Sequence, residues 1–124
     1  MRPMLWVGAG GFLGANARYL LGGWIADRWG TAFPLGTFVI NITGSFVLGL
    51  FLAFAEERSW LSPDYRLAFA IGFVGAYTTF STFSYETIRL LQDGAYGFAA
   101  ANVIGSVVLG IISAFAGFAL GAAL

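Results

Sequence analysis

The feature that most constrains this chain is the length of its nearly uncharged stretches. Residues 4–26, 35–55, 66–91 and 96–123 are long, mainly apolar and almost free of charge. A helix needs about 20 such residues to cross a bilayer. Only 10% of the residues are charged, against about 25% in a soluble domain. The sequence therefore predicts one all-α integral membrane domain over residues 1–124, with four transmembrane helices.

The connections between these stretches carry the signals that end and begin helices. Pro34 and Pro63 lie where helices are expected to begin, Ser62 is an N-cap for the third, and Asp93–Gly94 predicts a turn. Short connections make successive helices antiparallel neighbours. The apolar N-terminal stretch continues beyond the length of a signal peptide, which favours a retained first span.

Composition excludes several classes of function. The chain has no cysteine and no histidine, so it has no disulfide, no thiolate metal site and no histidine base. Its net charge is zero, without a basic cluster for nucleic acid. Without a pair of membrane carboxylates either, we expect no enzyme.

The arginines show no bias between the two sides of the membrane. Arg2, Arg58 and Arg66 lie on one side, and Arg28, Arg89 and, if counted, Arg18 lie on the other. Either other signals orient the chain, or it inserts both ways and pairs with an inverted copy.

An internal repeat bears on the same question. NITGSFVLG (41–49) and NVIGSVVLG (102–110) agree at six of nine positions, on spans that cross the membrane in the same direction. Such a repeat is not the inverted repeat of transporters. Any inverted symmetry would have to come from a second chain.

Residues 75–84, GAYTTFSTFS, place many hydroxyl groups in the third span. On a continuous helix, Thr78, Ser81, Thr82 and Tyr85 would share one face. A comparable stripe on the fourth span comprises Asn102, Ser106, Gly110 and Ser113. Neutral hydroxyls bind an anion weakly enough to release it, as conduction requires.

The same segment predicts an interruption of the helix. Gly72 and Gly75 precede Thr78 and Thr79, which are poor helix formers. A break would expose carbonyl groups suited to a hard cation. The nearby Phe80 and Phe83 either contact lipid and pack, or present electropositive ring edges to an anion.

Three further polar residues lie at membrane depth. Asn41, with Thr37 one turn earlier, either forms a hydrogen bond between helices or donates to a permeating ion. Arg18 either snorkels or is functional. Glu86 either pairs with Arg89 or serves the site. Glycine pairs at helical spacing, such as Gly10 and Gly14, predict close helix packing.

Four segments in order, GGFLGANARY, GTFVINITGSFVLG, GFVGAYTTFSTFS and NVIGSVVLG, resemble the Fluc/CrcB family of fluoride channels. The resemblance implies a dual-topology homodimer of antiparallel copies, in which the third helix is broken near its middle. Two fluoride pores would run between the copies in the inner (plasma) membrane. The expected function is passive fluoride export that relieves fluoride toxicity, and the expected partners are fluoride, the lipid bilayer and the inverted copy.

The resemblance also implies roles for individual residues. Backbone carbonyls of Gly75 and Thr78 would hold a structural sodium ion on the dimer axis. Arg18, Thr79 and Glu86 are further functional candidates. The predicted ion pathway comprises Thr37, Asn41, Phe80, Ser81, Thr82, Phe83 and Ser106.

The chain departs from the family pattern at two places. Ala76–Tyr77 stands where members often have a further glycine, and Gly110 stands where some carry a hydroxyl, which leaves Ser106 with less help. The main alternative is a proton-coupled small multidrug transporter. That class needs a carboxylate in the middle of the first span, where this chain has only Arg18.

Overall fold

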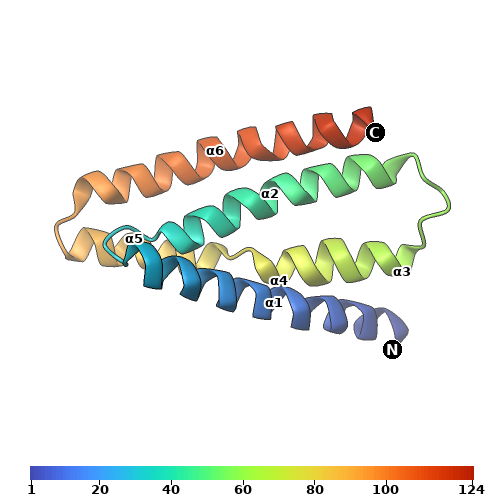
Figure 1. The fold of residues 1–124 in the computed structure, drawn as a ribbon, viewed down its shortest axis with the longest axis horizontal. Helices are drawn as coiled ribbons and strands as arrows, with labels where there is room; N and C mark the ends of the chain where they lie inside the picture. The colour runs from blue at the N-terminus through green and yellow to red at the C-terminus, as the bar shows by residue number, and fades with distance from the viewer.

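The computed structural model describes all 124 residues and is entirely helical. Helices α1 (Arg2–Trp29), α2 (Leu35–Glu56) and α6 (Tyr96–Ala123) are continuous, and the third is divided. Its parts are α3 (Pro63–Arg66), the π-helix η1 (Leu67–Val74), α4 (Gly75–Tyr77) and α5 (Phe80–Gln92). The result is an elongated bundle with both termini at the same end (Figure 1). The predicted all-helical fold is confirmed.

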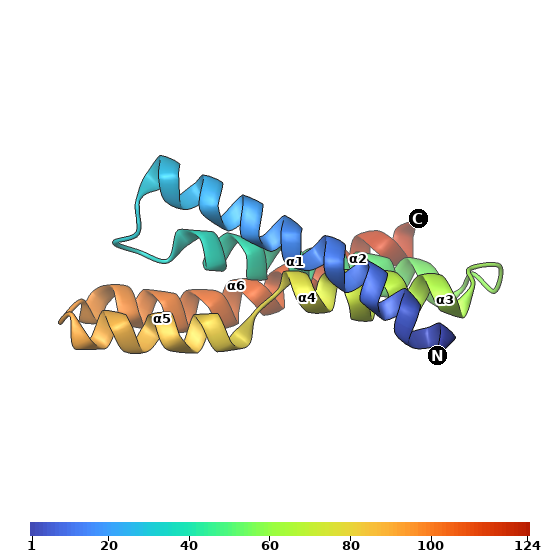
Figure 2. The same cartoon turned by 90° about the horizontal axis from the view of Figure 1, so that it is seen from below.

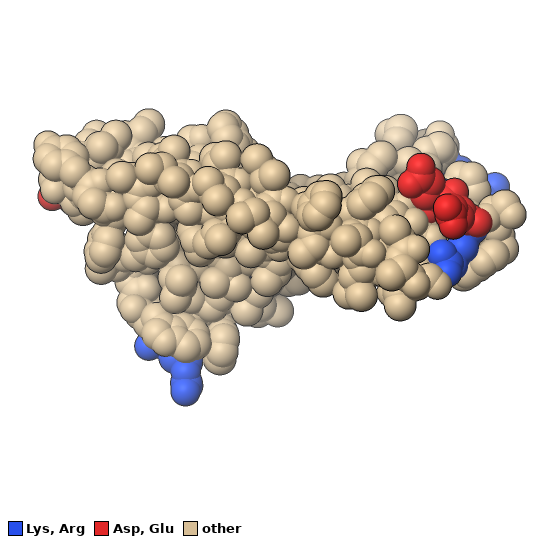
Figure 3. Space-filling view, turned by 90° about the horizontal axis from the view of Figure 1, so that it is seen from above, with Lys and Arg blue, Asp and Glu red and all other residues tan.

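Three of the helical segments are long and apolar enough to cross a membrane: Leu35–Glu56, Pro63–Gln92 and Tyr96–Ala123. α1 is long enough at 28 residues, but its glycines and Arg18 make it less apolar than the others. A span over residues 4–26 therefore stays a prediction. On the face drawn in Figure 3, charged side chains gather at the ends of the molecule and leave the middle bare, as a bilayer requires.

The helix ends follow the predicted signals. The Ser62 hydroxyl accepts the N–H of Asp64 at 3.2 Å and caps α3, with Pro63 in its first turn. Helix α2 begins at Leu35, directly after Pro34. Gly94 has φ 75° in the turn before α6, a conformation that glycine adopts without steric cost.

Glycines bring the helices together in two pairs. A Cβ at Gly117 or Gly121 of α6 would overlap the carbonyls of Phe46 or Leu50 in α2, so these backbones touch. The two helices lie side by side and run in the same direction (Figure 1), and they are the two that carry the internal repeat.

The second pair is α1 on η1. A Cβ at Gly10 would overlap the carbonyl of Ala68, and one at Gly14 would overlap that of Phe73. The predicted close packing by small residues is confirmed. Beyond this contact the second half of α1 runs apart from α5, with the beginning of α2 between them (Figure 2).

Candidate ion pathway

The third helix is interrupted at Thr78 and Thr79. Both have extended backbone, with φ −82° and ψ 158° at Thr78 and φ −153° and ψ 116° at Thr79. The predicted break is confirmed. It also corrects one expectation: the extended backbone takes Thr78 off the helical face of Ser81 and Thr82, and its hydroxyl donates to the Val74 carbonyl at 3.1 Å.

Asn41 of α2 supplies the hydrogen bonds that the break leaves unmade. Its Nδ2 donates to the Thr79 carbonyl at 3.0 Å, and its Oδ1 accepts the Thr79 N–H at 2.8 Å. Backbone groups at membrane depth need such partners. Asn41 therefore holds two helices together, and its second N–H hydrogen remains for another acceptor.

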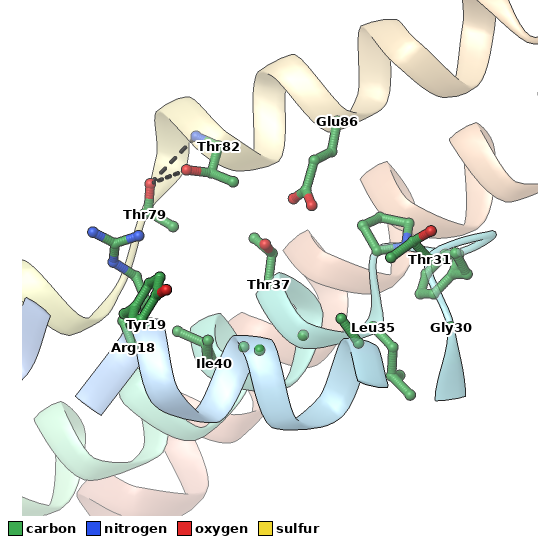
Figure 4. A pocket seen from close by; sticks show the side chains of 16 residues that line it. Arg18, Tyr19, Gly30, Thr31, Leu35, Thr37, Ile40, Thr79, Thr82 and Glu86 are labelled. Carbon is green, nitrogen blue, oxygen red and sulfur yellow. Dashed lines mark hydrogen bonds between the residues drawn. The ribbon is translucent and has the colours of Figure 1, made fainter. Parts of the chain in front are cut away.

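Thr79 also begins the next helix. Its Oγ1 accepts the N–H of Thr82 at 3.3 Å as the N-cap of α5, and it donates to Thr82 Oγ1 at 3.0 Å (Figure 4). Because the Thr79 N–H is bound to Asn41, the Gly75 carbonyl lacks the partner that a continuous helix would give it. A free backbone carbonyl suits a hard cation, so Gly75 fits the sodium ligand expected there, and the Thr78 ligand stays a prediction.

A cavity of about 290 Å³ lies against the break, and we call it the phenylalanine cavity. It brings together α2, the broken helix and α6. The rings of Phe80 and Phe83 lie 5.7 Å apart, inclined by 43°. Residues lining the cavity include Asn41, Ser45, Thr79, Phe80, Phe83 and Ser106. No charged side chain is among its lining residues.

A second cavity of about 290 Å³, the vestibule, opens between α1, α2 and α5. Its polar lining includes Arg18, Thr37, Thr79, Thr82 and Glu86 (Figure 4). Thr79 lines both cavities and so lies between them. The Arg18 Nε donates to the Ala76 carbonyl at 3.2 Å, so Arg18 satisfies the end of α4 rather than snorkelling freely.

Glu86 points into the vestibule (Figure 4), and its Oε1 is buried without a hydrogen-bond partner. Of the two roles considered for Glu86, the pairing with Arg89 is not found, since Arg89 Nη1 donates to the Tyr85 hydroxyl at 3.4 Å. The one ion pair in the chain joins Arg2 and Asp64. This unpartnered oxygen leaves Glu86 free to accept a hydrogen bond from a donor in the vestibule.

The structure thus divides the predicted pathway residues. Asn41, Phe80, Phe83 and Ser106 meet in the phenylalanine cavity, whereas Thr37 and Thr82 lie in the vestibule. Ser81 is exposed and lines neither cavity.

Sequence reasoning missed two residues of this region. Ser45 lines the phenylalanine cavity. It occupies the same position in the internal repeat as Ser106, and this equivalence was the signal that could have identified it. Thr87 binds Asn102 across α5 and α6 at 3.0 Å. The spacing of threonines along one helix carries no signal for a contact with another.

Known proteins resemble this chain over most of its length. The family model of the CrcB-like protein, Camphor Resistance (CrcB), matches residues 5–118. A relative from Acidobacterium capsulatum is 52% identical over 117 residues, 94% of each chain. A relative from Koribacter versatilis is 52% identical over 109 residues, 88% of this chain and 86% of that one. One from Geotalea uraniireducens is 44% identical over all of both chains.

Each of these three relatives bears the name fluoride-specific ion channel FluC. The matches cover nearly the whole chain, including the broken helix and both cavities. A channel family of this kind also agrees with the several helices that are long and apolar enough to cross a membrane. The chain belongs to the CrcB-like protein family.

Proposed function

We propose that this chain forms a fluoride-selective passive channel that lets fluoride leave the cell across the plasma membrane. The observation that carries the proposal is the phenylalanine cavity, where an amide, hydroxyl groups and two aromatic rings meet without any Lys or Arg. The names of the relatives identify the ion.

The chemistry of the cavity suits a small, strongly hydrated anion. Neutral N–H and O–H donors replace water around the ion without holding it as tightly as a cation would. Ring edges are electropositive, so Phe80 and Phe83 add favourable contacts while excluding water. The free hydrogen of Asn41 Nδ2 supplies a fixed donor.

The two cavities suggest the route. The vestibule, with Arg18 and Thr82, would collect the anion, and Thr79 would pass it to the phenylalanine cavity. Glu86, on the vestibule wall, would hold a water or donor near the ion rather than the ion itself, because its carboxylate repels an anion.

We further propose that two antiparallel copies complete the pores. Phe80 is 79% exposed in one chain, which would leave the wall of a pore facing lipid. A second, inverted copy would cover this wall and form two equivalent pores. Where the copies meet, the Gly75 and Thr78 carbonyls of both would surround a sodium ion, whose charge would stabilise the carbonyl groups that the breaks expose.

Ion efflux from liposomes that contain the purified protein tests the function. Fluoride should leave rapidly and chloride hardly at all. Phe80→Ile removes the ring edges, and Asn41→Asp places a negative charge at the cavity. Each should slow fluoride efflux at least about tenfold, the effect of about 1.4 kcal/mol on a barrier.

Trp60→Phe is a matched control, because Trp60 is an exposed ring in the loop between α2 and α3. It should leave the rate unchanged. Chloride efflux as fast as fluoride efflux, or fluoride efflux indifferent to both cavity variants, would contradict the proposal.

A further inference from the structure

A partly buried chain of hydrogen bonds leads from α5 to the phenylalanine cavity. It joins the Phe83 carbonyl, Thr87, Asn102 and Ser106. Asn102 is the only buried polar side chain in the molecule, at 2% exposure. Ser106, at the end of this chain, lines the cavity, whereas Asn102 and Thr87 do not.

The direction of each hydrogen bond follows from the number of protons. Thr87 Oγ1 donates its one proton to the Phe83 carbonyl at 2.8 Å, so it can only accept from Asn102 Nδ2, which lies 3.0 Å away. This orients the Asn102 amide. Its Oδ1 is thereby turned toward Ser106, whose Oγ donates to it at 3.4 Å.

Ser106 has one hydroxyl proton, and Asn102 Oδ1 and an anion in the cavity would compete to accept its hydrogen bond. While the Ser106 hydroxyl donates to Asn102, it presents only lone pairs to the cavity. A contact of 3.4 Å is much longer than the usual ~2.7–2.8 Å between hydroxyl and oxygen, so this bond is weak. An anion in the cavity would therefore accept the hydrogen bond from this hydroxyl in place of Asn102, at little cost in free energy.

Two other serines, one on α2 and one on α6, are bound differently. Ser45 donates to the Asn41 carbonyl at 2.7 Å, and Ser113 donates to the Ile42 carbonyl at 2.8 Å. Both are short bonds to backbone. Without the Asn102 side chain, Ser106 would turn to the backbone carbonyl one turn before it, as serines in helices commonly do.

We propose that Asn102 is a positioning residue for anion passage: it holds the Ser106 hydroxyl in a weak bond from which that hydroxyl turns to the ion. Thr87 keeps the amide of Asn102 in the required orientation. The inference rests on the proposed fluoride channel and adds to it a residue outside the cavity wall.

A double-mutant cycle with fluoride efflux from liposomes tests this. Asn102→Ala should raise the fluoride concentration at half-maximal efflux about tenfold, or about 1.4 kcal/mol, because Ser106 becomes bound to backbone. Ser106→Ala should have a similar effect. The double variant should be no worse than Ser106→Ala alone, since Asn102 acts through Ser106.

Thr87→Val keeps the shape of Thr87 and removes the acceptor for Asn102 Nδ2. It should weaken fluoride affinity in the native background and have no effect in the Ser106→Ala background. This variant decides the question if Asn102→Ala does not elute as a folded protein. Ser113→Ala, on the same helix but outside both cavities, should keep the native half-saturation.

The outcomes separate the two proposals. Fluoride efflux absent from liposomes with the unaltered protein would overturn the channel function. With that efflux present, effects of Asn102→Ala or Thr87→Val that persist undiminished in the Ser106→Ala background would overturn this inference alone, because they would show a role in packing.

Discussion

At the scale of single residues, polar side chains in this molecule serve the backbone as well as the cavity. Asn41 pairs with both backbone groups of Thr79, and Arg18 donates to the Ala76 carbonyl. Each compensates a hydrogen bond that the interrupted helix cannot make. These contacts tie both sides of the break to α1 and α2, beside the phenylalanine cavity.

The capping role of the Thr79 side chain can be tested by substitution. Thr79→Val keeps the shape but removes the acceptor for the Thr82 N–H, so the free energy of unfolding should fall by about 1 kcal/mol. Thr79→Ser retains the hydroxyl and should restore most of it. Chemical denaturation in detergent, followed by intrinsic fluorescence, measures both. Equal stability of the valine and serine variants would contradict the capping role.

At the scale of helices, glycine decides which surfaces meet. Gly10 and Gly14 seat α1 on η1, while Gly117 and Gly121 seat α6 on α2. Within a bilayer there is little hydrophobic gain from helix association, so close backbone contact provides the attraction. The two pairs position the elements that line the cavities.

Two glycines on α1 provide a matched comparison. A methyl group at Gly10 would overlap the Ala68 carbonyl, whereas one at Gly8 would meet nothing within 4 Å. Gly10→Ala should therefore lower the free energy of unfolding by about 1–3 kcal/mol. Gly8→Ala should leave it unchanged or raise it by up to about 1 kcal/mol, since alanine favours helix.

Thermal unfolding in the same detergent, monitored by circular dichroism, compares the two variants. If Gly10→Ala is as stable as Gly8→Ala, α1 does not rest on η1 in the way described.

At the scale of the whole molecule, the charges specify orientation only weakly. At the end that holds the termini, Arg58 donates to the Leu124 carbonyl at 2.9 Å, Arg66 bonds the Ala55 carbonyl, and Arg2 pairs with Asp64. These arginines join neighbouring helices to one another. The opposite end carries about as many arginines, so neither side is favoured by the positive-inside rule.

The chain has no cysteine, so single cysteines report its orientation directly. Ser59→Cys lies in the exposed loop at the end with the termini, and Gln92→Cys lies exposed at the other end of the molecule. If the chain inserts both ways, a membrane-impermeant maleimide added to intact cells should label about half of each variant. Complete labelling of one and none of the other would mean a single orientation and would exclude the antiparallel dimer.

Several features of the fold and site were predictable because they depend on local chemistry. The apolar stretches determine α2, the divided helix and α6, and Ser62, Pro63 and Gly94 mark the ends that the structure confirms. The glycines and threonines of GAYTTFSTFS predicted the break. These signals act over a few residues, so the sequence contains them directly.

What the sequence by itself determined is therefore a helical membrane protein with a broken third helix and a hydroxyl-rich segment. Only the tertiary structure decided that Asn41 binds Thr79, that Glu86 is not paired with Arg89, and that Thr78 leaves the face of Ser81 and Thr82. It also placed Asn102 behind Ser106. The physical reason is that each of these depends on which helix faces which and at what depth, and helix packing, not spacing along the chain, sets that geometry.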